Sequence, residues 1–329
     1  MHFIIKLIRR FKEKQKQNKN MDKGSQSGEK SPQILSRKLE KNLEAVKARF
    51  EESSDLIIRK FSFGKDKDGE VKAALVFLDG MINLPMINDS IIKPLMHDSR
   101  HFHAEEAFDI SSMDEIRDRL LAAGEVKTVY TLNEVTEACL SGNAVLMAEG
   151  SCKALDIGAK GWEQRNVTEP TSETAVRGPR EGFTENLRTN TSMIRRKIKD
   201  PALRIRATVI GKRTHTQVNI LYMDGIADPD LIREVERRLK KVDTDAILAA
   251  GYLEEYIEDS PFTAFPTAWC SEKPDAVAGK LLEGRVVIAV DGAPFVMTVP
   301  MLFIENFQSA EDYITRSYYA TAIRILRLT

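Results

Sequence analysis

The side chains in this sequence with the clearest potential for chemistry are a group of histidines. His97, His101 and His103 lie close together, and the pair spaced four residues apart could bind a metal ion from one face of a helix. No cysteine and no second histidine pair completes such a site, and the acidic residues around it are typical of a protein surface. We therefore expect neither a metal ion nor another cofactor.

Arginines concentrate in residues 177–198, RGPREGFTENLRTNTSMIRRKI, just past the middle of the chain. After Gly178 and Pro179 interrupt the backbone pattern, apolar residues recur at helical spacing from Phe183 to Ile198. A planar guanidinium can form paired hydrogen bonds with a carboxylate. We expect a charge network that ties this segment to the rest of the protein or to a partner, although a solvated helix face has the same composition. Its expected members are Arg177, Arg180, Arg195, Arg196, Glu181 and Asn186.

Motifs that identify an enzyme do not occur in the sequence. There is no glycine-rich phosphate loop of the GxGxxG or GxxxxGK[ST] type, and no GxSxG or HExxH motif. Because no constellation of nucleophile, base or metal ligands is visible, we do not expect an enzyme. The 49 basic and 49 acidic residues balance, so no overall field attracts nucleic acid.

The length and the cysteine content indicate an intracellular protein of about two domains. The chain has 329 residues and no apolar run close to the ~20 residues that a membrane helix needs. Cys139, Cys152 and Cys270 are sparse and odd in number, which fits a reducing compartment, and we expect them to be thiols that fill the core. The basic residues 1–20 are either a flexible tail or a segment that lies on an anionic membrane.

Four stretches of the chain carry a family pattern. They are residues 177–198, YMDGIADPDLI from Tyr222, SPFTAFPTAW from Ser260, and LLEGRVVIAVDGAPFVMTVPMLFIENFQSAEDYITRS from Leu281. In this order they resemble the A-subunit family of spore germinant receptors, the GerA family. Members of that family continue into transmembrane helices, whereas this chain stops at Thr329, so it resembles the soluble N-terminal part of such a subunit.

The resemblance implies a function in spore germination. The full receptor, with its B and C partner subunits, would respond to a small nutrient such as an amino acid or a sugar. This domain would lie on the cytoplasmic side of the spore inner membrane, attached through a transmembrane region that follows it. It would sense the nutrient or relay the signal to the membrane part. The alternative is a scaffold domain that assembles the receptor subunits and binds no small molecule.

Turn signals indicate that the second half of the chain repeats the first. Asp79-Gly80 recurs as Asp224-Gly225, and Glu149-Gly150 recurs as Asp291-Gly292. The helical pattern of residues 36–50 recurs at 184–198, and Thr131 with Glu134 has the spacing of a capping box. Chance similarity between two α/β units is the alternative explanation. We predict an α/β fold of two similar lobes with mixed sheets, joined by a linker, each lobe ending in a β-hairpin.

The predicted domains place the candidate residues around a hinge. They are a disordered basic tail (1–33), an N-terminal α/β lobe (34–160), a linker (161–182), a second α/β lobe (183–305) and a juxtamembrane helix (306–329). Two lobes on a hinge form a clamshell, and clefts between domains are common ligand sites. The candidates for ligand binding or inter-lobe contact are Asp79, Asn83, Arg177, Arg180, Glu181, Asn186, Asn190, Arg195, Arg196 and Asp224.

Overall fold

The computed structural model describes residues 33–51, 53–66, 69–97, 112–161, 181–247, 250–258, 266–302 and 305. The fold below belongs to the unit Leu35–Thr329, from which residues Met1–Ile34 are separate. The predicted basic tail, most of the predicted linker and the predicted juxtamembrane helix lie outside the described residues, as do His101 and His103.

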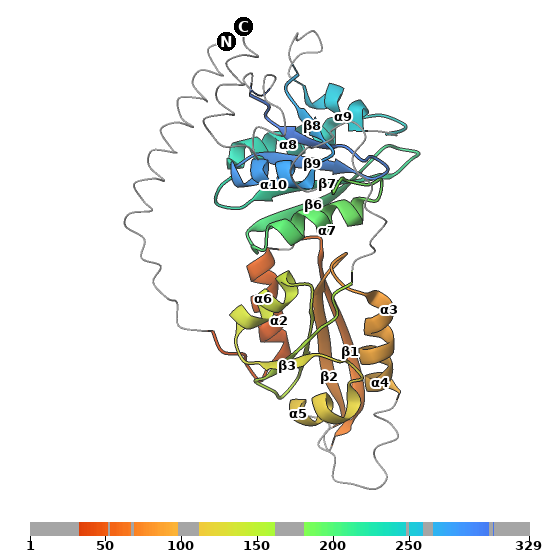
Figure 1. The fold of residues 1–329 in the computed structure, drawn as a ribbon, viewed down its shortest axis with the longest axis vertical. Helices are drawn as coiled ribbons and strands as arrows, with labels where there is room; N and C mark the ends of the chain where they lie inside the picture. Colours follow the sequence, from red (N-terminus) through yellow and green to blue (C-terminus); the bar gives the residue numbers. More distant parts are fainter. Residues whose placement is uncertain are drawn as a thin grey trace, which may run out of the picture. The chain divides into compact units, whose positions relative to one another are not determined.

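The first lobe consists of a five-stranded sheet with helices on both faces (Figure 1). Its elements are α2 (Leu39–Phe50), β1 (Leu56–Asp66), β2 (Gly69–Leu78), α3 (Leu84–Ile87), the π-helical turn η1 (Asn88–Ile92), α4 (Lys93–Met96), α5 (Met113–Glu115), the π-helical turn η4 (Ile116–Leu120), β3 (Val126–Val129), α6 (Leu132–Leu140), β4 (Ala144–Ala148) and β5 (Ala154–Ile157). The strands lie in the order β1-β2-β4-β5-β3. Their side chains alternate between two cores, because successive residues of a strand point to opposite faces.

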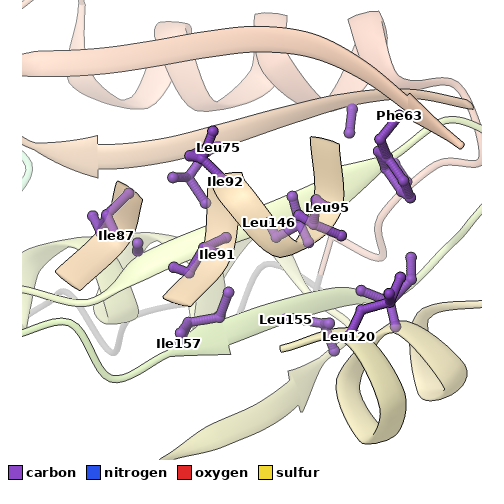
Figure 2. Close-up of a cluster of buried hydrophobic side chains, with 14 of the residues drawn as sticks. Phe63, Leu75, Ile87, Ile91, Ile92, Leu95, Leu120, Leu146, Leu155 and Ile157 are labelled. Carbon is purple, nitrogen blue, oxygen red and sulfur yellow. The ribbon is translucent and has the colours of Figure 1, made fainter. Parts of the chain in front are cut away.

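One core of the first lobe lies between the sheet and the helical segment α3–η1–α4. Leu75, Leu146 and Leu155 of the sheet pack there against Ile91 and Leu95, all of them fully buried (Figure 2). On the other face, α2 and α6 cover the sheet with the apolar residues that the helical spacing predicted, among them Leu39, Leu43, Val46 and Phe50. The lobe is therefore a three-layer sandwich of helices, sheet and helices.

The second lobe repeats this architecture. Its elements are α7 (Leu187–Lys197), β6 (Leu203–Ile210), β7 (Thr216–Met223), α8 (Pro229–Lys241), α9 (Ala250–Ile257), β8 (Trp269–Ser271), α10 (Pro274–Leu282), β9 (Val286–Val290) and β10 (Val296–Val299). The strand order β6-β7-β9-β10-β8 is that of the first lobe. Helices α7 and α10 pack on one face, and α8 and α9 on the other.

The prediction of two similar α/β lobes is confirmed, but the sheets are antiparallel and not mixed. Every pairing between the described strands is antiparallel. A helical crossover such as that from β3 through α6 to β4 is typical of two strands that run in the same direction. However, β5 is inserted between β3 and β4 and pairs antiparallel with both, and β10 does the same between β8 and β9.

Matching hydrogen bonds support the internal repeat at atomic level. Asn42 accepts a hydrogen bond from the backbone N–H of Ser36 at 2.8 Å and donates one to its carbonyl oxygen at 2.6 Å. Asn190 makes the same two bonds with Thr184, at 2.7 and 2.6 Å. An amide side chain suits such a clasp of the preceding loop at the start of a helix, because its NH2 group donates while its carbonyl oxygen accepts. The two asparagines therefore align α2 with α7.

The acidic residue in the turn of the last hairpin, β4–β5 or β9–β10, makes the same contact in both lobes. The carboxylate of Glu149 accepts from the backbone N–H of Leu39 at 2.8 Å, and that of Asp291 accepts from Leu187 at 3.2 Å. Both bonds satisfy an unpaired N–H in the first turn of a helix. The acidic-glycine turns are thus more than local turn chemistry, since they fasten each hairpin to α2 or α7.

Candidate functional site: the contact between the two lobes

A buried ion pair joins the lobes. The guanidinium of Arg195, on α7, donates to both carboxylate oxygens of Asp55 in the first lobe, at 2.9 and 3.1 Å. The side chains are 1% and 9% exposed. A further N–H of Arg195 donates to the carbonyl oxygen of Asp200 at 3.2 Å. A two-point contact between a guanidinium and a carboxylate fixes orientation as well as distance, so this pair sets how the two lobes meet.

The hydroxyl of Ser53 completes this buried network. It donates to Asp55 at 2.8 Å and accepts from the backbone N–H of Ile205 in β6 at 3.0 Å. The neighbouring Ser54 donates its backbone N–H to the carbonyl oxygen of Ile205 at 2.8 Å. Backbone groups of the second lobe therefore depend on the first lobe for their hydrogen bonds, and separating the lobes would leave them without these partners.

Arg204 forms a second charged link between the lobes. Its side chain, only 8% exposed, donates to the carbonyl oxygens of Arg49 and Pro201, each at 2.9 Å. Its other terminal nitrogen lies 3.4 Å from the carboxylates of Glu51 and Asp224. Arg204 thus holds the end of α2 in the first lobe against the start of β6.

The loop Asp79-Gly80 of the first lobe packs directly on α7. Arg188 donates to the carboxylate of Asp79. A β-carbon at Gly80 would lie 3.1 Å from the carbonyl oxygen of Arg188 and 3.1 Å from Cβ of Ser192, and Gly80 has φ of +75°. Both the space and the backbone conformation therefore require glycine. The loop is in van der Waals contact with the helix, where the clamshell prediction expected a cleft.

The face of α7 that meets the first lobe differs from the corresponding face of α2. With the two helices aligned on Asn42 and Asn190, the contacting residues Arg188, Ser192 and Arg195 correspond to Glu40, Glu44 and Lys47. The contact therefore uses side chains that only the second copy of the repeat possesses. This divergence accounts for two of the arginines in residues 177–198, Arg188 and Arg195.

The three asparagines among the predicted site residues serve the local structure. Asn83 caps α3 by accepting from the N–H of Met86 at 3.1 Å, and Asn186 caps α7 by accepting from Thr189 at 3.0 Å. Asn190 is fully buried in its clasp with Thr184. Each of these side chains thus bonds backbone atoms of its own helix or of the loop just before it.

The charged members of the predicted set divide into three groups. Arg195 and Asp79 lie in the contact between the lobes, and Asp224 reaches its edge through Arg204. Arg196 lies 3.8 Å from Glu181 within the second lobe. Arg177 and Arg180 lie outside the described residues.

Sequence reasoning missed Asp55, Ser53 and Arg204. Ser53, Ser54 and Asp55 are typical of an ordinary turn between a helix and a strand. Arg204 stands in a strand where a buried apolar residue is the usual choice, and a charged residue among the apolar ones of β6 was the available signal.

A second buried charge cluster lies where the chain leaves β10. Glu305 accepts from Lys280 at 2.6 Å, from Arg285 at 2.7 Å and from the backbone N–H of Leu302 at 2.9 Å. Burial raises the pKa of Glu305, but the hydrogen bonds from Lys280 and Leu302 and the charges of Arg285 and Lys280 outweigh it, so the pKa is lowered. The ionised carboxylate therefore holds this segment on the second lobe.

Two features relevant to function can be stated for the described residues only. Among them, no group of three or more His, Cys, Asp or Glu side chains could hold a metal ion. No helix in this part of the chain is long and apolar enough to cross a membrane.

The fold and the contact together define a class of protein, a duplicated α/β domain whose two lobes meet through buried charges. The chain belongs to the family described as Bacillus/Clostridium GerA spore germination protein, whose sequence model matches residues 44–329. The resemblance noted in the sequence is therefore confirmed. This family is one of germinant-receptor subunits and is not a known class of enzyme.

Individual relatives agree with this assignment. The chain is 41% identical to spore germination protein KA of Bacillus subtilis (strain 168) over 297 residues, which cover 90% of this chain and 53% of that protein. It is 36% identical to spore germination protein B1 of the same organism, over 88% of this chain and 58% of the relative. The chain thus spans little more than half the length of these relatives.

A solved structure shows the same fold. The crystal structure of the N-terminal domain of the A subunit of the Bacillus megaterium spore germinant receptor GerK3 matches with a TM-score of 0.64 and 33% identity. The match covers 83% of this chain and 99% of that one. The chain therefore resembles the N-terminal domain of a germinant-receptor A subunit.

Proposed function

We propose that this chain acts as the N-terminal domain of the A subunit of a nutrient-responsive germinant receptor, and that its two lobes relay the signal as one body. The receptor would include B and C partner subunits and would lie in the spore inner membrane, with this domain on the cytoplasmic side. The observation that carries the proposal is the buried ion pair of Arg195 with Asp55.

The two lobes would move as one body because separating them costs free energy. Breaking a buried ion pair by removing one partner costs about 3–5 kcal/mol, because an uncompensated charge remains in a medium of low polarity. Opening the contact to water costs less per charge but also removes the backbone bonds of Ile205. A displacement of either lobe is then passed to the other.

We propose that recognition of the nutrient, an amino acid or a sugar, takes place in a partner subunit and not between these lobes. The amide oxygens of Asn83 and Asn186 accept from backbone N–H groups, and the amide of Asn190 is engaged with Thr184. The Asp79-Gly80 loop is packed on α7. Entry of a ligand at this contact would have to displace hydrogen bonds that the lobes need. A scaffold that only assembles the receptor is the competing function.

A charge exchange at the exposed part of the contact tests the relay. The pair of Asp79 with Arg188 is partly exposed, so Asp79→Arg or Arg188→Asp alone brings like charges together without burying them. We expect spores carrying either variant to respond more slowly to nutrient at an unchanged receptor level, and the double variant to recover. Arg233→Asp, which reverses an exposed charge on α8, is the matched control.

The outcomes separate the relay from the scaffold. A receptor level that falls in proportion to the nutrient response would favour the scaffold. Normal responses from both single variants would refute a relay through this contact. Titration of the purified domain with amino acids and sugars tests the remaining point: saturable binding that disappears when Asp79, Asn186 and Asp224 are all replaced by alanine would place the nutrient between the lobes.

A further inference from the structure

The second lobe exposes apolar side chains at one end of α10. Ile226, which follows β7, is 49% exposed, and Leu282, the last residue of α10, is 54% exposed. The segment that follows α10 approaches Ile226, because a β-carbon at Gly284, two residues after Leu282, would lie 3.0 Å from the carbonyl oxygen of Ile226. Exposed aliphatic side chains acquire meaning when the corresponding residues of a repeated structure are buried, and the first lobe supplies that comparison.

The corresponding surface of the first lobe is covered. Met81 and Leu140 occupy the equivalent positions and are only 1% and 4% exposed. The equivalence is given by Gly142, at which a β-carbon would lie 3.0 Å from the carbonyl oxygen of Met81, as at Gly284 with Ile226. The loop that contains Met81 is the Asp79-Gly80 loop, which lies against α7. Met81 and Leu140 also belong to the core of the first lobe itself, and the backbone N–H of Gly161 donates to the carbonyl oxygen of Met81 at 3.5 Å.

The Asp79-Gly80 loop differs from its counterpart in a further contact, that with α7. Gly80 and Gly225 share a φ of +75°. Gly80 touches Arg188 and Ser192 of α7, whereas nothing lies within 4 Å of a β-carbon placed on Gly225. The side chain of Asp79 is 27% exposed and that of Asp224 is 48% exposed, with Arg204 at 3.4 Å. Among the residues that the structure describes, no helix therefore lies against the second-lobe loop that corresponds to Asp79-Gly80.

We propose that Asp224, Gly225, Ile226 and Leu282 form a docking surface for an α-helix of another protein. The contact inside this chain supplies the template for that helix. The docked helix presents a basic residue to Asp224, as Arg188 does to Asp79. Four positions later it places a small residue over Gly225, as Ser192 does over Gly80. Residues three and four apart share one face of a helix. Apolar side chains beside them cover Ile226 and Leu282.

A second copy of this chain does not fit the surface. Helix α2, which corresponds to α7 in the repeat, has Glu40 and Glu44 at the positions of Arg188 and Ser192. The first would repel Asp224, and the second is too large for the space over a glycine, so these residues act against self-association. Helix α7 of a second copy is already occupied by that copy's own Gly80 loop. Neither α2 nor α7 of a second copy therefore fits the surface, and the partner that we propose is a different polypeptide.

This proposal rests on the proposed function in that the receptor supplies the partner. The test uses the full-length protein in spores, with the photoreactive residue p-benzoylphenylalanine in place of Ile226 or Leu282. Tyr252, on α9 and 53% exposed, is the matched control position. After illumination, we expect a covalent adduct at 226 and at 282, and no such adduct at 252. Mass spectrometry of the adduct identifies the partner segment.

We expect that segment to be a helix of a different protein with Arg or Lys four residues before Gly, Ala or Ser. The substitution Asp224→Lys should lower the adduct yield at 282. No adduct above the control, an adduct to a second copy, or an adduct unaffected by Asp224→Lys would overturn the docking surface. If that happens while Asp79→Arg still slows the response to nutrient, the relay stands and only the docking surface fails.

Discussion

The buried pair of Arg195 with Asp55 makes a quantitative prediction for stability. With side chains 1% and 9% exposed, removal of either partner leaves a charge that solvent does not reach. We expect Asp55→Ala and Arg195→Met each to lower the free energy of unfolding by about 3–5 kcal/mol. For a domain of about 150–250 residues, 1 kcal/mol shifts Tm by about 2–4 °C, so the expected loss is roughly 6–20 °C.

The double variant distinguishes a charge pair from simple loss of packing. Replacing both partners leaves no unpaired charge, so the double variant should be more stable than the sum of the single effects implies. Arg188→Met removes the partly exposed pair with Asp79 and should cost only about 0–1 kcal/mol. Urea unfolding of the purified protein, followed by circular dichroism, measures all four variants. Single effects below about 1 kcal/mol, or effects that add within about 0.5 kcal/mol, would refute the role assigned to the pair.

Three further predictions concern other parts of the fold. Gly80→Ala should destabilise the protein more than Gly225→Ala, because both carry the strain of φ +75° but only Gly80 is in contact with α7; equal losses in urea unfolding would contradict the contact. Burial raises the pKa of the Cys139 thiol to about 12, whereas Cys152 is exposed, so iodoacetamide at pH 8 should alkylate Cys152 in the folded protein and leave Cys139 unmodified, as peptide mapping would show. The carboxylate of Glu305, with its lowered pKa, stabilises the fold above its ordinary pKa of 4.5, and this stability is lost as pH falls through the lowered value. Glu305→Gln should therefore be less stable at pH 7 and should lack this part of the acid dependence, and an unchanged pH profile of urea unfolding would exclude the ion cluster as its source.

The features that could be predicted from the sequence depend on residues close together in the chain. The capping box of Thr131 with Glu134 forms as predicted, because its partners are three residues apart. The Asp-Gly and Glu-Gly turns mark the ends of strands in both lobes, since a positive φ is available locally to glycine. Repetition of these local signals was enough to predict two similar lobes, and the family motifs were enough to predict a germinant-receptor subunit.

The strand order was decided by the tertiary structure. A helix between β3 and β4 indicates that the two strands run in the same direction, but it does not say whether a third strand lies between them. Insertion of β5 at that position is a pairing between strands distant in the chain, since β5 pairs with both β3 and β4. Local signals in the sequence do not specify such a pairing, and the prediction of mixed sheets was wrong.

The contact between the lobes was also beyond what the sequence determined by itself. The composition of residues 177–198 predicted that Arg195 would belong to a charge network. Its carboxylate partner is Asp55, 140 residues away in the chain. Nothing near Asp55 in the chain distinguishes it from an ordinary turn residue, because what makes it special is the removal of water from around it when the lobes meet. The sequence determined the repeated lobes and the arginine that joins them, and the tertiary structure decided which carboxylate that arginine neutralises, since burial is a property of the packed molecule and not of the local chain.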